Sequence, residues 1–145
     1  MKIIASASML LVTAAPAVVS GDAAQVAKQG HYGTVKLEQV VAGHLNELNG
    51  RYKLRVTEVT YDPAGFIGDH HHVGPGIRCV TVGELTYVQS EKTTVYRSGD
   101  CFFESGDISH SAFNRTNKPT VLLNFELLPA DWTGGSAIPV PSTSK

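Results

Sequence analysis

Two histidine-bearing stretches decide the fold of this chain. The first reads Gly65-Phe66-Ile67-Gly68-Asp69-His70-His71-His72 and continues through Val73-Gly74-Pro75-Gly76. The second reads Gly99-Asp100-Cys101-Phe102-Phe103-Glu104-Ser105-Gly106-Asp107-Ile108-Ser109-His110, and Asn114 closes it. A β-strand points successive side chains to opposite faces, so His70 and His72 share one face while His71 points away. The spacing therefore places two imidazoles side by side.

His110 supplies a third imidazole if its strand lies beside that of His70 and His72. Three neutral nitrogen donors converging on one point suit a divalent transition metal that keeps open coordination positions. The chain has 6 histidines, and three of them at this spacing favour a metal site over ordinary core or surface histidines. The sequence does not choose among Fe, Mn, Ni, Zn and Cu. His31 and His44 precede the predicted barrel and carry no such signal.

The rest of the chain has the pattern of short strands separated by turns. Apolar or alternating runs recur at intervals of about ten residues with no convincing helical stretch between them, which is typical of a sandwich or barrel. The Asp62-Pro63-Ala64-Gly65 segment predicts a turn that ends a strand over residues 52–61, and residues 22–33 are expected to form a loop or brief helix. The other predicted strands cover residues 34–41, 77–82, 85–89, 93–97, 101–103, 111–114 and 120–128.

Around His70 the chain resembles the first motif of the cupin family. The His-x-His pair of that motif falls on His70 and His72, and the spacing from His72 to Gly76 and on to Gly83 also agrees. Gly65 lies one residue away from the expected leading glycine. The main departure is Gly76, which stands where the family usually has its carboxylate metal ligand.

The second cupin motif is also present. Its leading glycine, histidine and asparagine fall on Gly99, His110 and Asn114, whereas Ser105 and Asp107 replace the usual proline and glycine. The resemblance implies an all-β fold, a double-stranded β-helix or jelly-roll barrel. We therefore predict a cupin domain over residues 34–130, in which Asn114 fixes the loop after His110, and a tail over residues 131–145 that is extended or disordered.

The missing carboxylate leaves two alternatives for the metal site. Either the three histidines bind the metal alone, or Glu104 takes the vacant role; an ordinary surface carboxylate is the competing interpretation of Glu104. Arg78 lies two residues beyond Gly76, and strand alternation points it to the same interior side. A guanidinium inside a barrel is costly unless it meets an anion. Arg78 is thus expected either to bind a carboxylate of the substrate or to pair with an internal Glu or Asp.

The resemblance implies a small-molecule substrate but does not select a reaction. We expect a metal-dependent, oxygenase-like enzyme that acts on a small organic acid or phenolic compound, with Arg78 as the catalytic residue that orients a carboxylate. The alternative is a non-catalytic exported cupin that captures a small ligand or metal, which the missing carboxylate at Gly76 favours. The resemblance also implies a homodimer. The strand over residues 34–41 would be a suitable edge for the second subunit to cover, because an open apolar edge risks aggregation.

Composition and the N-terminus limit the remaining possibilities. The 145 residues carry a formal net charge of −1 and no basic run interleaved with aromatics, which argues against nucleic acid as a partner. Lys2, an apolar stretch and small residues around Ser20 predict a signal peptide over residues 1–20, and the stretch is too short and Ala/Ser-rich for a membrane span. We therefore expect a periplasmic or secreted protein, with a cytoplasmic one as the alternative. Cys79 and Cys101 are expected to be buried thiols in preference to a disulfide.

Overall fold

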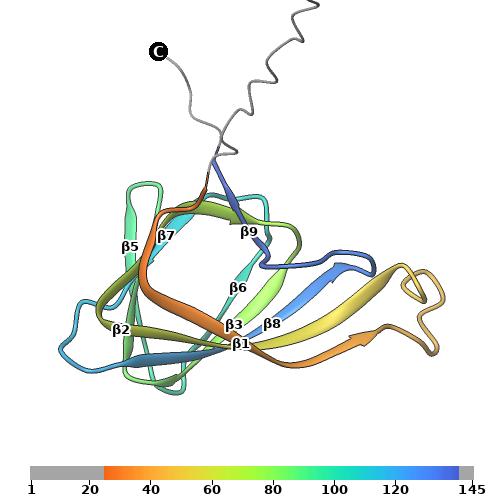
Figure 1. Ribbon diagram of the computed structural model, residues 1–145, viewed down its shortest axis with the longest axis horizontal. Helices are drawn as coiled ribbons and strands as arrows, with labels where there is room; N and C mark the ends of the chain where they lie inside the picture. Colours follow the sequence, from red (N-terminus) through yellow and green to blue (C-terminus); the bar gives the residue numbers. More distant parts are fainter. Residues whose placement is uncertain (1–24, 141–145) are drawn as a thin grey trace, which may run out of the picture.

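The computed structural model describes residues 25–140, and all regular structure in that range is β (Figure 1). The strands are β1 (Lys28–Val40), β2 (Tyr52–His72), β3 (Gly76–Val82), β4 (Glu84–Gln89), β5 (Lys92–Arg97), β6 (Cys101–Glu104), β7 (His110–Phe113), β8 (Thr120–Pro129) and β9 (Ala137–Pro139). Within residues 25–140 there is no helix that could cross a membrane. The predicted signal peptide over residues 1–20 lies outside the described residues.

The strands form one antiparallel sheet that curls into a nearly closed barrel, which confirms the predicted jelly-roll fold. The order is β5-β4-β7-β2-β8-β3-β6, and β1 and β9 add to β2. The first part of β2 pairs with β1 on one side and β8 on the other, while its last part pairs with β7 and β9. In Figure 1, β1, β2 and β8 sweep out together to one side of the barrel. β2 therefore connects the barrel with this extension.

The predicted turn over residues 62–65 is instead a bulge inside β2. Tyr61 pairs with His31 and Phe66 pairs with Gln29, so four residues of β2 stand opposite a single residue of β1. Ala64 takes a positive φ of 61° there. A bulge bends its strand and increases the local twist, which lets β2 change pairing partners without ending.

Asn114 fixes this bulge, as its predicted structural role requires. It is 1% exposed, and its Nδ2 donates to the carbonyls of Tyr61, Asp62 and Lys118 at 3.1, 3.0 and 2.7 Å. Its Oδ1 accepts from the backbone N–H and the hydroxyl of Thr116. One side chain thus ties the bulge of β2 to the loop between β7 and β8.

The barrel interior has an apolar part and a polar part. The apolar core is a cluster of buried side chains from five strands: Val59, Tyr61, Ile67, Val80, Leu85, Ala112 and Leu122. Beside it, the inner faces of β2, β3, β6 and β8 bury charged side chains: Lys53, Arg55, Arg78, Glu104 and Glu126. Charged groups are seldom buried without a partner, so the polar part of the interior is where a functional site is expected.

The expectation of two buried thiols is wrong, because Cys79 and Cys101 form a disulfide. They stand directly opposite each other on β3 and β6, with Cα atoms 4.1 Å apart. Strand alternation turns Arg78 and Val80 into the barrel and leaves Cys79 on the outer face, and Cys101 is exposed. The cysteines therefore lie on the side of the sheet opposite to the charged interior.

The N-terminal end of the described chain is more ordered than predicted, and the C-terminal tail takes the extended form of its two predicted alternatives. β1 begins at Lys28, so residues 28–33 form a strand and not a loop or brief helix. The C-terminal tail is an extended arm as far as β9, which pairs with His70, His71 and His72 of β2. Ser136, just before β9, is 8% exposed, so the arm is packed against the barrel next to the histidines.

Candidate metal centre

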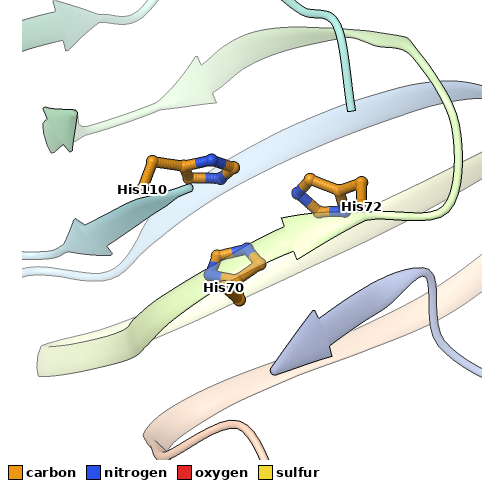
Figure 2. Close-up of side chains that lie close together, drawn as sticks. All are labelled: His70, His72 and His110. Atoms are coloured by element: carbon orange, nitrogen blue, oxygen red, sulfur yellow. The ribbon is translucent and has the colours of Figure 1, made fainter. Parts of the chain in front are cut away.

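The three predicted histidines meet inside the barrel. His70 and His72 come from β2, His110 comes from β7, and His70 and His110 are direct partners in the register. The ring centroids lie 4.3 to 5.2 Å apart, and one nitrogen from each ring falls within 4.8 Å of the others. Figure 2 shows the imidazoles turned toward a common space. This arrangement could hold one metal ion, as the sequence predicted.

Two of the imidazoles have their Nδ1 atoms held by backbone carbonyls. His70 Nδ1 lies 2.7 Å from the Gly68 oxygen, and His110 Nδ1 lies 3.1 Å from the Ile108 oxygen. A carbonyl only accepts, so each Nδ1 carries the proton and each Nε2 keeps a free lone pair. Such a partner on the second ring nitrogen is the usual arrangement behind a metal-ligating histidine.

His72 is oriented by a longer hydrogen-bond chain. Its Nδ1 lies 3.2 Å from Ser136 Oγ, and that hydroxyl donates its own proton to Glu126 Oε1. Ser136 therefore accepts from His72 Nδ1, and the Nε2 of His72 is left free like those of the other two rings. Ser136 belongs to the C-terminal arm, so the arm contributes directly to the site.

Glu104 faces the histidines and is not a surface carboxylate. It is 7% exposed, with Oε1 3.1 Å from His110 Nε2 and Oε2 3.3 Å from His72 Nε2. Two ligand atoms that share one metal at bond lengths near 2.1 Å lie about 3.0–3.4 Å apart in octahedral or tetrahedral geometry. Oε2 is also the oxygen that pairs with Arg78 Nε at 2.7 Å, so Glu104 stands between the guanidinium and the histidines. The donor set of three imidazoles and one carboxylate thus fits a divalent transition metal.

Arg78 fills the space beside Gly76, where the cupin resemblance implies a carboxylate. A Cβ atom at residue 76 would lie 2.2 Å from Arg78 Nη1. Gly76 stands between Glu104 on β6 and Glu126 on β8 in the register. Arg78 bridges these two glutamates, with Nε 2.7 Å from Glu104 and Nη2 3.2 Å from Glu126. Of the two partners expected for Arg78, the structure therefore contains the internal glutamates.

The electrostatics of this cluster favour a cation. The formal charges of Glu104 and Glu126 exceed that of Arg78 by one negative unit. Burial lowers the pKa of His70 to about 4 and that of His72 to about 3. Burial alone would raise the pKa of Glu104, but the positive charge of Arg78 opposes this effect, and the pKa is lowered below its ordinary value. Neutral imidazoles and an ionised carboxylate are the protonation states that metal binding requires.

The histidines open onto a cavity of about 940 Å³. Leu85, Leu122 and Tyr87 contribute to its apolar wall, and Lys53 and Arg55 line it as well. The Tyr87 ring stacks on the ring of His110 at a centroid distance of 4.8 Å. A cavity of this size, with apolar walls beside converging polar and charged groups, is large enough for a small molecule.

Sequence reasoning missed four polar residues of this interior: Lys53, Arg55, Glu126 and Ser136. In the 52–61 strand the apolar residues suggested the buried face, but Leu54 is 56% exposed whereas Lys53 is 5% exposed. In this strand the charged residues Lys53 and Arg55 face the interior and Leu54 faces outward. The alternation of the strand is visible in the sequence, but nothing in it shows that the charged face is the buried one. Ser136 has no sequence signal, because it lies in a tail of small residues and prolines.

Comparison with known proteins agrees with this geometry. The cupin-domain profile matches residues 57–126, and none of the proteins with curated descriptions matches the chain in sequence. Among solved structures, the polyketide cyclase RemF from Streptomyces resistomycificus superposes with a TM-score of 0.57 at 14% identity, over 79% of this chain and 75% of that chain.

Two other solved structures have the same architecture. A conserved double-stranded β-helix protein from Klebsiella pneumoniae gives a TM-score of 0.53 at 20% identity, over 75% of this chain and 85% of that one. A cupin-domain protein from Bordetella pertussis gives 0.51 at 20% identity, over 70% and 96%. At these identities the likeness concerns the fold alone. Together with the matched profile and the barrel, it shows that this chain contains a cupin domain.

Proposed function

We propose that this protein is a metal-dependent, oxygenase-like enzyme that acts on a small organic substrate. One divalent transition metal would be held by His70, His72, His110 and Glu104. The observation that carries the proposal is the convergence of the three imidazoles, two of which have their Nε2 atoms 3.1 and 3.3 Å from the buried Glu104 carboxylate. The adjoining cavity of about 940 Å³ supplies room for the substrate.

The residues around the histidines would hold and orient both metal and substrate. When bound, the metal would act as a Lewis acid and a template with open positions. Arg78 would keep the Glu104 carboxylate ionised and aimed at the histidines, a positioning role in place of the substrate contact first considered for it. Burial raises the pKa of Tyr61 and that of Tyr87, so both phenols stay protonated. Tyr87, which lines the cavity beside His110, could then donate a hydrogen bond to a substrate oxygen.

The disulfide supports a location outside the cytoplasm. Structural disulfides such as Cys79–Cys101 form and persist mainly in oxidising compartments. We therefore propose that the protein is exported, to the periplasm or the medium. Alkylating the free thiols in intact cells and then comparing the mass of the protein before and after reduction would test this. The proposal expects Cys79 and Cys101 to be unalkylated before reduction. A chain carrying two alkylated cysteines before reduction would contradict it.

The second candidate is a non-catalytic exported cupin that binds a ligand or metal. The observation that favours it is the loss of the usual carboxylate position, because Arg78 occupies the space beside Gly76. Both candidates bind a small molecule or a metal, so the distinction depends on turnover.

Metal analysis together with an activity screen tests the proposal. Protein loaded separately with Fe, Mn, Ni, Zn or Cu should retain about one ion per chain, as expected for a single three-histidine site. Glu104→Gln should weaken metal binding beyond the roughly 10–100-fold typical of removing an outer hydrogen-bond partner. Glu58→Gln is the matched control, because Glu58 forms an exposed ion pair with Lys36 on the outside.

Turnover decides between the two candidates. Small organic acids and phenols would be supplied to each loaded form while oxygen uptake and product formation are followed. The enzyme proposal requires activity with one particular ion, its loss with chelator and its return with that ion. Ligand or metal binding without turnover would favour the binding protein, and a chain that retains no metal would refute the enzyme.

We also propose a homodimer in which β1 is covered. β1 pairs only with β2 among the described strands and exposes Tyr32, Val35 and Leu37 at 54%, 51% and 60%. An apolar edge of this kind is an aggregation risk unless it is covered. Light scattering at micromolar protein should give a dimer mass that Leu37→Glu lowers, and a monomeric wild type would refute the proposal.

A further inference from the structure

A second polar part of the cavity, the cationic end, consists of Lys53 and Arg55, which form no hydrogen bond or ion pair with the three histidines in the described residues. Lys53 and Arg55 lie on β2 and are 5% and 6% exposed, and both line the cavity. Arg55 stands directly opposite Glu126 on β8, and the Glu126 carboxylate accepts from Ser136, the partner of His72. The cationic end on β2 therefore lies across the β2–β8 strand pair from Glu126, which belongs to the hydrogen-bond chain behind the histidines.

The cationic end carries more positive than negative charge. Glu38 is the one carboxylate within ion-pair distance of these two side chains among the described residues. Its oxygens lie 2.8 Å from Lys53 Nζ and 2.6 Å from Arg55 Nε. The other hydrogen-bond partners of the two cations are the backbone carbonyls of Trp132 and Gly134, which carry no formal charge. Two buried cations therefore share one carboxylate, and that carboxylate is itself 35% exposed.

Several donors of this end are still available. A guanidinium has five N–H donors and an ammonium has three. Arg55 uses Nε for Glu38 and Nη1 for Gly134, and Lys53 donates to Glu38 and Trp132. Nη2 of Arg55 donates to no residue that the structure describes. The Nη2 of a guanidinium that lines a cavity can donate to a carboxylate oxygen, and the second proton of Nη1 lies beside it for a two-point contact.

We propose that Lys53 and Arg55 form an anion subsite for a carboxylate of the substrate. This inference rests on the proposed function, in which the other end of the substrate faces the histidines. The substrate class is then a small acid with two polar ends, one directed to the metal and the other held by Arg55. Arg78 does not serve as this anchor, because its Nε and Nη2 are already paired with Glu104 and Glu126.

A purely structural role is the competing explanation. Lys53 and Arg55 also fasten the 132–134 segment and β1 to the sheet through the same contacts. That role alone predicts no binding of free carboxylates and no dependence of affinity on the length of a ligand. The two explanations therefore differ in a measurable way.

The experiment uses calorimetry with the full chain, without metal and loaded with cobalt. The probes are linear dicarboxylates from malonate to adipate and monocarboxylates of the same length. Without metal, wild-type protein should bind monocarboxylates, and Arg55→Gln should abolish this. With cobalt, one dicarboxylate length should bind at least about tenfold more tightly than its monocarboxylate, a difference of about 1.4 kcal/mol. Arg55→Gln should remove that preference and leave the cobalt content unchanged.

Two more variants keep the result interpretable. Arg55→Lys retains the charge but loses the two-donor edge, so it should show an intermediate preference. Lys36→Gln, in an exposed ion pair on the outside of the barrel, should behave like wild type.

The outcomes separate the subsite from the metal site. The subsite would be overturned if metal-free wild type and Arg55→Gln bound monocarboxylates with equal affinity. It would also be overturned if cobalt-loaded wild type showed no preference for any dicarboxylate length. Failure to bind cobalt would instead refute the proposed function, while the measurements without metal would still decide the subsite.

Discussion

Gly76→Ala tests whether the space of the usual cupin carboxylate is filled by Arg78. The new methyl group would lie 2.2 Å from Arg78 Nη1 and 2.6 Å from the carbonyl oxygen of Phe125. Neither distance is compatible with van der Waals contact, so the guanidinium has to leave its place. Its contacts with Glu104 and Glu126, at 2.7 and 3.2 Å, would then be broken or distorted.

The magnitude follows from the burial of this ion-pair cluster. Breaking a buried pair costs about 3–5 kcal/mol, and inserting a methyl group into a packed interior costs about 1–3 kcal/mol. Because both terms arise from the same displacement, they do not simply add, and we expect a loss of at least about 3 kcal/mol. For a domain of this size that corresponds to a fall in Tm of roughly 10 °C. Metal affinity should fall as well, because Glu104 loses the cation that orients it.

Urea denaturation of the metal-free protein, with chelator titration of the loaded form, measures both effects. Gly135→Ala is the control, because no atom lies within 4 Å of the position its methyl group would take. A double-mutant cycle with Arg78→Ala isolates the clash, since Gly76→Ala should cost less once the guanidinium is gone. A Gly76→Ala protein with wild-type stability and metal affinity would refute this account of the site.

Three other changes test the hydrogen bonds and the buried imidazoles near the histidines. Ser136→Ala should weaken metal binding by about 10–100-fold, as is typical for the outer partner of a ligating histidine, and Ser136→Thr should retain most of the affinity in chelator competition. Asn114→Ala should cost about 2–6 kcal/mol in urea denaturation, because the carbonyls of Tyr61 and Asp62 lose this donor, whereas Thr116 can still donate to Lys118, and each carbonyl costs about 1–3 kcal/mol when left unsatisfied; a loss below about 1 kcal/mol would mean that water replaces the amide. Metal-free protein should lose stability as the pH falls from about 6.5 toward 4. Burial lowers the pKa of His70 to about 4 and that of His72 to about 3, so in this pH range only the unfolded chain takes up protons on these two histidines. Each histidine contributes up to about 1.4 kcal/mol per pH unit, and a flat stability curve between pH 7 and 5 would contradict this.

The sequence predicted the parts of the site that depend on local spacing. His70 and His72 alternate within one strand, so their common face follows from the geometry of any β-strand. The placement of His110 opposite His70 could be predicted only through the cupin resemblance, because register between distant strands is not visible in one sequence. The inward direction of Arg78 followed from the same alternation.

The remaining features depend on tertiary structure. Glu104 faces the histidines because β6 pairs with β3 in a particular register, and no pattern in the second motif specifies that register. The disulfide depends on the same pairing, which places Cys79 and Cys101 opposite each other on the outer face. The bulge at residues 62–65 contains ordinary turn residues, and tertiary contacts hold β2 through it: the hydrogen bonds from Asn114 and the pairing with β1 on both sides.

The walls of the cavity extend beyond the part of the chain that the cupin profile covers. The three histidines and Glu104 lie inside residues 57–126, whereas Lys53 and Arg55 precede this range and the arm with Ser136 follows it. On the functions proposed above, the metal-binding residues and the residues that select the ligand therefore occupy separate segments. Mutations in the flanking segments could change the compound that is accepted while the metal ligands stay the same. Divergence among small cupins of this architecture should accordingly concentrate in the strand extension and the C-terminal arm, which offers a route to new specificities without rebuilding the barrel.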